Sequence, residues 1–337
     1  MTVLQEGRAR RPRRRPHRVL RRTGRALAVL LLAGVALLAL MAARAQGPAT
    51  IALENPIIPP HVKPAALQPR RGSYGIAPAP AAEQVSVKLK LPLRSGLLFD
   101  INTGQVLWQK NPTRALAIAS LTKMMTALLV ATHAKATDRV LITRDALHYT
   151  GSGVGLLPRN KRVSLTTLLY GLLLPSGNDA AIALADHVAG TQARFIALMN
   201  QKADALGLRC THFTTVSGII DQGNYSCAQD LALIAHLVLK QPLLAHIVAS
   251  RSAILPFPIK GGKLYLYNNN PLLLLRYPGV DGVKTGFTDA AGQCLVATAR
   301  RGRTWLGVVL LHAGDTSTEA QRLLNAGFTS VAKARQS

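Results

Sequence analysis

The sequence predicts an α/β fold of the α+β type, in which helices flank an antiparallel sheet and an all-helical subdomain carries a Ser-Gly-Asn loop. Alternating apolar stretches within 279–311, separated by turn residues, are typical of three antiparallel strands. Segments 120–130 and 179–186 are rich in helix formers and lack Gly and Pro. About 245 residues remain after the N-terminal segments, enough for one substantial core or two closely packed subdomains.

The first 45 residues have the pattern of a targeting segment. Ten arginines lie between Arg8 and Arg25, an uncharged apolar run of eighteen residues covers 26–43, and residues 43–45 include small side chains that suit a signal peptidase. A basic run directly before an apolar stretch favours a membrane flank over a nucleic-acid-binding arm. We therefore expect export to the periplasmic or extracellular face of the cytoplasmic membrane, with 1–45 as a cleaved signal peptide or a retained membrane anchor.

Residues 46–88 are rich in Pro and Ala and show little periodic patterning, which predicts a linker between the membrane and a folded domain. The predicted domain covers 89–331. Its first element is a hairpin, in which a strand at 96–100 turns at 102–104 into a second strand at 105–108.

The end of the domain is predicted to be a helix that runs through Phe328, with Thr316 and Glu319 suited to a capping box. The glycine-rich stretch 151–155 lacks the spacing of a dinucleotide-binding loop, so we expect a mobile loop near the cleft there. The chain has no repeat of fixed period and no sustained heptad, which excludes a solenoid and a coiled coil.

Ser120 and Lys123 stand at the start of the predicted helix, in Ala-Ser-Leu-Thr-Lys. Residues three apart in a helix share one face, so the serine hydroxyl and the lysine amine are expected side by side. A serine hydroxyl needs a nearby base to become a nucleophile, and apolar neighbours lower the pKa of an amine toward a value useful for a base. The free N–H groups of the first turn can also stabilise an oxyanion. By itself, the segment also fits an N-capping serine beside a solvated lysine.

Ser176 and Asn178 lie between an apolar run at 168–174 and the next predicted helix. A loop between two helices can hold a hydroxyl and an amide in one cleft. We expect Ser176 to relay a proton between Lys123 and a departing amine, and Asn178 to hydrogen-bond the substrate backbone. The alternative for this segment is a turn that caps the following helix.

Lys284, Thr285 and Gly286 lie on the first of the three predicted strands. A strand edge with an ammonium and a hydroxyl suits an extended peptide that ends in a carboxylate, because the backbones pair and the charged end is held by Lys284 and Thr285. Gly286 is expected to leave room for the substrate. A Walker A loop is excluded because it needs Gly before Lys, where this chain has Val283. A plain edge-strand lysine is the alternative.

The three segments occur in one order, each in a suitable setting, which favours a single serine acyl-transfer site over three unrelated turns. From about residue 95 to residue 328 the chain resembles the low-molecular-mass penicillin-binding proteins that act as serine-type D-alanyl-D-alanine carboxypeptidases. The resemblance also rests on Ala-Leu-Gly-Leu at 205–208, Thr-His-Phe at 211–213 and the segment 281–289.

The resemblance implies a β-lactamase/transpeptidase-like fold and a role for each motif residue. It implies that Ser120 is the acylated nucleophile, Lys123 the proton acceptor and Ser176 the second catalytic hydroxyl. The substrate-binding residues that it implies are Asn178, Lys284, Thr285, Gly286 and Phe287, with backbone N–H groups of Ser120 and Phe287 as the oxyanion hole. The implied partners are a peptidoglycan stem peptide, which loses its terminal D-alanine, and β-lactam antibiotics, which inhibit by acylating Ser120.

Other functions compete with this interpretation. A class A β-lactamase shares the motifs but needs a Glu between the second and third to activate its deacylating water, and this chain has none between Glu83 and Glu319. An endopeptidase of the same family, cutting peptidoglycan cross-links, stays open, although Ser-Gly-Asn is the carboxypeptidase-like form. A non-enzymatic wall-binding module would not need Lys123. Many relatives carry a C-terminal anchor, and here we expect the N-terminal segment to replace it.

The net charge is +26, of which the first 45 residues, with eleven arginines and one glutamate, contribute +10 and leave +16. A basic surface suits polyanionic envelope polymers, and it equally suits an ordinary solvated surface.

The cysteines and histidines argue against a metal site. Cys210, Cys227 and Cys294 are odd in number and lack C-x-x-C spacing, so neither zinc nor a disulfide framework is supported, while one bridge stays open in an oxidising compartment. Cys294 lies in an apolar strand and is expected to be a buried packing thiol. The nine histidines form no H-E-x-x-H motif, so a metallopeptidase is disfavoured and no metal or cofactor is expected.

Overall fold

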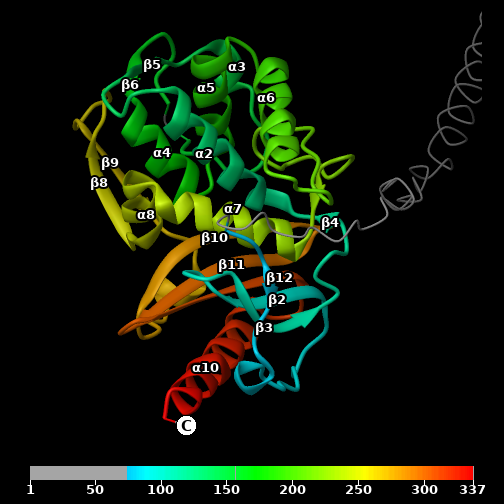
Figure 1. The fold of residues 1–337 in the computed structure, drawn as a ribbon. Helices are drawn as coiled ribbons and strands as arrows, with labels where there is room; N and C mark the ends of the chain where they lie inside the picture. The colour runs from blue at the N-terminus through cyan, green and yellow to red at the C-terminus, as the bar shows by residue number, and fades with distance from the viewer. Residues whose placement is uncertain (1–73, 156, 337) are drawn as a thin grey trace, which may run out of the picture. The chain divides into compact units, whose positions relative to one another are not determined.

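A six-stranded sheet lies at the centre of the computed structural model, which describes residues 74–155 and 157–336 (Figure 1). The strand order is β1-β3-β2-β12-β11-β10, and all neighbours are antiparallel except β1 and β3. The strands are β1 (Ala77–Pro78), β2 (Leu93–Asp100), β3 (Gln105–Lys110), β10 (Val280–Thr288), β11 (Gly292–Arg301) and β12 (Thr304–Ala313). The predicted N-terminal hairpin and the predicted three-strand unit are both confirmed.

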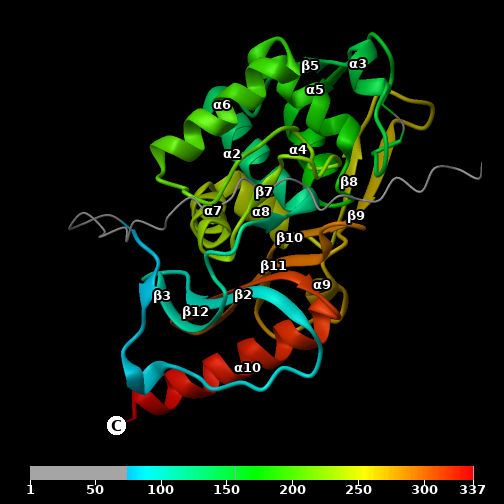
Figure 2. The same ribbon diagram turned by 90° about the vertical axis from the view of Figure 1, so that its right-hand side faces the viewer.

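The sheet separates two hydrophobic layers because its strands carry apolar residues on both faces. Along β2, Leu97 and Phe99 contribute to one layer and Leu98 to the other, as the two-residue period of a strand requires. All three side chains are completely buried. A sheet that is apolar on both sides needs a helical cover on each, and Figure 2 shows α10 on one face and α7 with α8 on the other.

The helical lobe, defined here as α2 to α6, stands beyond α7 and α8 (Figure 1). Helices α2 and α5 pack against each other at its centre, and the fold-class prediction of helices flanking an antiparallel sheet is confirmed. The lobe is not all-helical, because the ribbon of β5 (Arg139–Leu141) and β6 (Arg162–Ser164) belongs to it. The helices are α2 (Lys123–His133), α3 (Arg144–Leu147), α4 (Leu165–Leu173), α5 (Asn178–Ala189), α6 (Gln192–Ala205), α7 (Ala228–Lys240) and α8 (Pro242–Ala249).

Smaller elements connect the lobe and the sheet. The 3-10 turns are η1 (Ala81–Glu83) and η2 (Ala119–Thr122), and α9 (Pro271–Leu274) is a single turn. The remaining two-stranded ribbons are β4 (Leu116–Ala117) with β7 (Tyr225–Ser226), and β8 (Ser252–Pro256) with β9 (Lys263–Tyr267). Among the described helices none is by itself long and apolar enough to cross a membrane. The pair α7 and α8, bent by 104°, meets that test together by length and composition only.

The closing helix α10 (Thr316–Ala334) starts differently from the prediction. Asp315 is its N-cap, and its carboxylate accepts the backbone N–H groups of Ser317 and Thr318 at 2.8 and 3.2 Å. Glu319 is not part of a capping box, because its Oε1 accepts the backbone N–H groups of Lys90 and Leu91 at 2.8 and 3.0 Å. The predicted capping box is therefore wrong, and the glutamate connects α10 to the chain entering β2.

The segment 74–88, assigned to the linker from the sequence, lies against the domain. Its strand β1 pairs with β3, and the backbone N–H of Val85 donates to Leu107 O at 2.9 Å. Ala79 is only 4 % exposed and belongs to the layer that α10 covers. The boundary expected at residue 88 therefore moves toward the N-terminus, because the alternating apolar side chains of this stretch pack on the sheet. The predicted targeting segment, 1–45, and residues 46–73 of the predicted linker lie outside the described residues.

Replacing Glu319 by Ala is expected to destabilise the domain. The change removes the acceptor of two backbone N–H groups, and a partly buried donor without a partner costs about 1–3 kcal/mol. Glu319→Gln can keep both hydrogen bonds, because a single oxygen accepts them, and should lose much less. Urea unfolding of the three proteins measures the difference, and equal unfolding midpoints for Ala and wild type would contradict this role of Glu319.

Candidate active site

Ser120 lies in the 3-10 turn η2, which leads directly into α2. In a 3-10 turn the residues i and i+3 eclipse each other, so Lys123, the first residue of α2, lies directly over Ser120. The regular helix therefore begins three residues later than the sequence suggests, and the predicted alignment still holds. Ala119 has φ +46, in the left-handed region, a conformation that costs about 1–3 kcal/mol and is often found at functional sites.

The Lys123 amine is completely buried and surrounded by three oxygen atoms. Its Nζ lies 2.8 Å from Ser120 Oγ, 2.7 Å from Asn178 Oδ1 and 2.7 Å from the Ser217 carbonyl oxygen. A neutral amine has two hydrogens and one lone pair. It can therefore donate to Asn178 and Ser217 while its lone pair accepts the hydroxyl proton of Ser120.

Burial lowers the pKa of Lys123 well below its ordinary value, because water no longer solvates the ammonium. The nearby charge of Lys284 lowers this pKa further, and the carboxylate of Asp179 opposes the shift. The net effect favours the neutral amine, the form that can act as a base.

Ser176 and Asn178 lie at the junction of α4 and α5, as the sequence predicts. Ser176 is buried and lines a cavity, and no hydrogen-bond partner for its Oγ is found among the described residues. Asn178 is the first residue of α5, and both ends of its amide are engaged, with Oδ1 near Lys123 and Nδ2 donating to Thr150 O at 2.6 Å. The structure thus places Asn178 to orient Lys123, whereas the sequence suggested a direct contact with substrate.

Asp179 fixes the glycine-rich loop beside the site. Its carboxylate oxygens accept the backbone N–H groups of Val154 and Gly155 at 2.8 and 3.0 Å. The backbone N–H of Asn178 donates to Ser152 O at 2.8 Å, which ties the same loop to the start of α5. The loop 151–155 therefore lies at the cleft, as expected. These three bonds hold it there, and its expected mobility stays a prediction.

Lys284 and Thr285 lie on β10, the edge strand of the sheet next to η2. Lys284 is 1 % exposed, and its Nζ donates to Thr285 O at 2.9 Å. Burial lowers the pKa of Lys284 from 10.5 to about 7. The predicted edge position of these residues is confirmed, and the strand keeps one side free of strand partners within the described chain.

Gly286 allows β10 to approach the turn that carries Ser120. A Cβ at this position would lie 2.9 Å from Ile118 O and 3.1 Å from Ser120 N. The missing side chain thus makes room for the chain's own nucleophile turn, whereas the sequence suggested room for substrate. The next residue, Phe287, has a side chain that is 65 % exposed at the rim.

A cavity of about 420 Å³ lies at the site. Ser120, Ser176 and Thr285 contribute to its wall, so each of the three predicted motifs supplies a lining residue, whereas the buried Lys123, Asn178 and Lys284 are not among the lining residues. The predicted residues that line the cavity are Ser120, Ser176, Thr285, Gly286 and Phe287, and its further lining residues include Ser152, Asn269 and Pro271.

Sequence reasoning missed the carbonyl of Ser217 and the hydrogen bond from Asn224 Nδ2 to Thr122 Oγ1, which measures 2.9 Å. A backbone carbonyl leaves no signature in the side-chain pattern, so the sequence holds no signal for this contact. Cys210 and Cys227 form a disulfide, and Cys294 is a buried free thiol, as expected. Within the described residues the one group of potential metal ligands is formed by this cysteine pair with Asp230.

A family model described as D-alanyl-D-alanine carboxypeptidase, peptidase S11, matches residues 82–315. The chain belongs to this family. It is 34 % identical over 244 residues to the D-alanyl-D-alanine carboxypeptidase DacF of Bacillus subtilis, and 36 % identical over 267 residues to DacA of Escherichia coli. These matches cover 70 % and 73 % of this chain, and 62 % and 65 % of the two relatives. The chain thus spans slightly less than two thirds of the length of these family members.

Solved structures of the family share this fold. A serine-to-alanine mutant of the Streptomyces K15 DD-transpeptidase aligns with a TM-score of 0.67 at 31 % identity, covering 72 % of this chain and 100 % of that one. A D-alanyl-D-alanine carboxypeptidase from Mycobacterium tuberculosis aligns with a TM-score of 0.67 at 32 % identity, covering 73 % and 96 %. The β-lactamase/transpeptidase-like fold that the sequence suggests is confirmed.

Gly286→Ala is expected to slow acylation of Ser120 about a hundredfold, because displacing a reacting group by about 1 Å can cost that much. The added methyl meets the backbone of η2, so the turn must shift. The rate of adduct formation with a penicillin measures the effect. Gly302→Ala is the control, because its Cβ meets nothing within 4 Å at the far end of β11. Its φ of +56 should lower stability by about 1–2 kcal/mol and leave the rate unchanged.

Proposed function

We propose that this chain is a serine-type D-alanyl-D-alanine carboxypeptidase that removes the terminal D-alanine from peptidoglycan pentapeptides through an acyl-enzyme on Ser120. The observation that carries the proposal is the 2.8 Å approach of Ser120 Oγ to the buried amine of Lys123. Family membership supports the same substrate class.

In the proposed acylation, Ser120 Oγ attacks the carbonyl carbon of the bond between the two D-alanines. Lys123, neutral because burial lowers its pKa, accepts the hydroxyl proton. The amine of the leaving D-alanine must gain a proton as the C–N bond breaks. Ser176 lines the same cavity, and its hydroxyl, which has no hydrogen-bond partner among the described residues, suits the relay of this proton from Lys123. Water then attacks the ester, with Lys123 again as the base.

The substrate is proposed to pair with the free edge of β10, with its C-terminal carboxylate held by Lys284 and Thr285. The oxyanion would lie between the N–H groups of Ser120 and Phe287, since the Gly286 position brings the two segments together. Asn178 contributes by orienting Lys123.

A β-lactamase activity is disfavoured because no glutamate is available to activate a deacylating water. Within the described residues, Glu83 lies in η1 and Glu319 is buried against Lys90 and Leu91. We therefore expect the adduct with a penicillin to be long-lived, which makes β-lactams inhibitors.

Transpeptidation is a second candidate, because a protein named DD-transpeptidase aligns over 100 % of its own length with 72 % of this chain. The two reactions share the acyl-enzyme and differ in the acceptor, which is water or an amine. Digestion of a pentapeptide with and without an added amino acceptor separates them, and a cross-linked dimer tested alongside reports endopeptidase activity.

We also propose that the enzyme works outside the cytoplasmic membrane. The support is the basic run followed by an apolar stretch in residues 1–45, together with the cell-wall substrate of the family. This segment lies outside the described residues. Finding mature protein that begins at Gln46 and is free of membrane would favour a signal peptide over an anchor.

Incubation with benzylpenicillin is expected to add one penicilloyl group, located on Ser120 by peptide mapping. Ser120→Ala should form no adduct and release no D-alanine from a pentapeptide, because the acyl group then has no acceptor. Intact-mass spectrometry measures the adduct. An adduct on another serine, or D-alanine release by the Ala variant, would refute the proposal.

The value of kcat/KM is expected to fall as the pH rises, with an apparent pKa of about 7. The pKa of Lys284 is about 7 because the group is buried, so above that pH the free enzyme loses the charge that attracts a carboxylate. A bound carboxylate stabilises the ammonium, so the matching limb of kcat should lie at higher pH. Lys284→Ala should lower kcat/KM and lose the alkaline limb. If the alkaline fall in kcat/KM persists in this variant, it arises from a group other than Lys284.

A further inference from the structure

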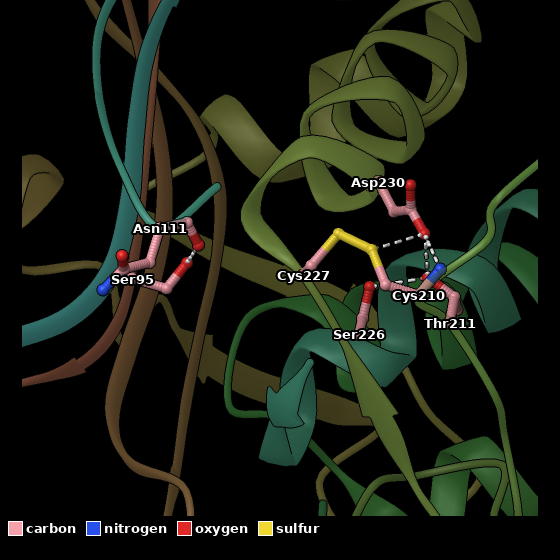
Figure 3. Close-up of a disulfide and its surroundings, with 7 residues drawn as sticks. All are labelled: Ser95, Asn111, Cys210, Thr211, Ser226, Cys227 and Asp230. Atoms are coloured by element: carbon pink, nitrogen blue, oxygen red, sulfur yellow. Dashed lines mark hydrogen bonds between the residues drawn. A yellow bond between two sulfur atoms is a disulfide. The ribbon is translucent and has the colours of Figure 1, made fainter. Parts of the chain in front are cut away.

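The disulfide Cys210–Cys227 closes the segment 211–226 at its base (Figure 3). The two cysteines are 17 residues apart in sequence, and their Cα atoms lie 5.7 Å apart. Neither belongs to the motifs of the proposed reaction. The segment that they close nevertheless supplies the Ser217 carbonyl, one of the three oxygen partners of Lys123.

The base of the segment is fixed to α7 through Asp230. Its Oδ2 accepts the backbone N–H of Cys210 at 3.0 Å and the hydroxyl of Thr211 at 2.7 Å, and a second contact of 2.8 Å joins Thr211 Oγ1 to Ser226 Oγ. Figure 3 shows these groups gathered around the disulfide. The covalent bond thus joins the two ends of the segment at the point where hydrogen bonds attach it to a core helix.

The far part of the segment contacts the elements that carry Ser120 and Lys123. Val216 O accepts the hydroxyl of Thr126 on α2 at 2.7 Å. Asn224 Nδ2 donates to Thr122 Oγ1 at 2.9 Å. A Cβ on Gly218 would collide with the carbonyl of Ala119, so the segment lies tightly against the nucleophile turn.

Hydrogen bonds also brace the segment: Asn200 of α6 exchanges two with the backbone of Phe213, and Thr214 Oγ1 donates to Gln222 O at 2.9 Å. Strand β7 pairs only two residues with β4, and the outer side chains His212, Ile219, Ile220 and Gln222 are exposed. Closing a chain segment with a disulfide removes conformational freedom that hydrogen bonds alone would have to restrict. The Ser217 carbonyl lies 2.7 Å from Lys123 Nζ, and a displacement of about 1 Å would break this hydrogen bond.

We propose that the Cys210–Cys227 disulfide is a positioning element of the acyl-transfer site, which holds the Ser217 carbonyl in place and thereby keeps Lys123 against Ser120. The inference rests on the proposed function, because it assigns Lys123 the task of a base.

The test compares the rate constant and the amplitude of Ser120 acylation by benzylpenicillin, followed by quench and intact-mass detection. The proteins are the oxidised wild type, the wild type reduced with a phosphine, and Cys210→Ala/Cys227→Ala with and without the phosphine. Both reduced wild type and double variant should reach full amplitude with a rate constant about tenfold lower, as expected for a displaced base. The phosphine should not change the double variant.

The outcomes separate positioning from stability and from the proposed function itself. A bond that served only stability would lower the fraction of protein that reacts and leave the rate constant of the reacting molecules unchanged. Equal rate constants in all four samples would also overturn the inference. Absence of any adduct in the oxidised wild type would instead refute the proposed function.

Asn224→Ala sharpens the test through a double-mutant cycle. The variant removes the hydrogen bond from the segment to Thr122 of η2, together with the acceptor of the Thr214 N–H inside the segment. If the disulfide and the Asn224–Thr122 hydrogen bond hold the same carbonyl, removing Asn224 should slow acylation at least threefold more in the double cysteine variant than in the oxidised chain. Equal factors in the two backgrounds would show that the disulfide and Asn224 act independently, which contradicts a shared positioning role.

Discussion

The buried amine of Lys123 sets the main constraint on this structure. A neutral amine removed from water needs a hydrogen-bond partner for each hydrogen and for its lone pair. Lys123 Nζ has three oxygen atoms within 2.8 Å. These oxygens come from three separate parts of the chain: the turn η2, the start of α5, and the segment that the disulfide closes. The amine can therefore be satisfied only when these three parts of the chain have come together.

Two lysines share the burial of the cleft but serve opposite purposes. Lys123 gains its proposed function by losing charge, and Lys284 gains its proposed function by keeping it. The charge of each disfavours a second charge nearby, and the lowered pKa of Lys123 has Lys284 as its second cause after burial. A carboxylate bound beside Lys284 would compensate that charge, so substrate binding and the protonation of Lys123 are expected to be coupled.

Much of the site could be predicted from the sequence because side chains, which the sequence names directly, supply most of its reactive groups. The sequence predicts the correct type of element for each motif, because helix formers and alternating apolar residues mark those elements. Lys123 begins a helix, Ser176 lies in a loop between helices, and Lys284 lies on a strand. The errors concern groups whose partner is distant in sequence. Glu319, expected in a capping box, instead binds a backbone segment more than 200 residues away.

Residues 74–88 occupy the sheet edge opposite the one that carries the site. A six-stranded sheet has two edges, and an uncovered edge is a liability unless it has a use. Strand β1 covers the β3 edge, and Tyr74 at the start of this stretch stacks on His236 of α7 with ring centroids 3.5 Å apart. The chain thus enters the domain at the edge farthest from β10, leaving β10 as the edge without a strand partner in the described chain. In the proposed function, an extended peptide that adds a strand to the sheet would pair with β10, which carries Lys284.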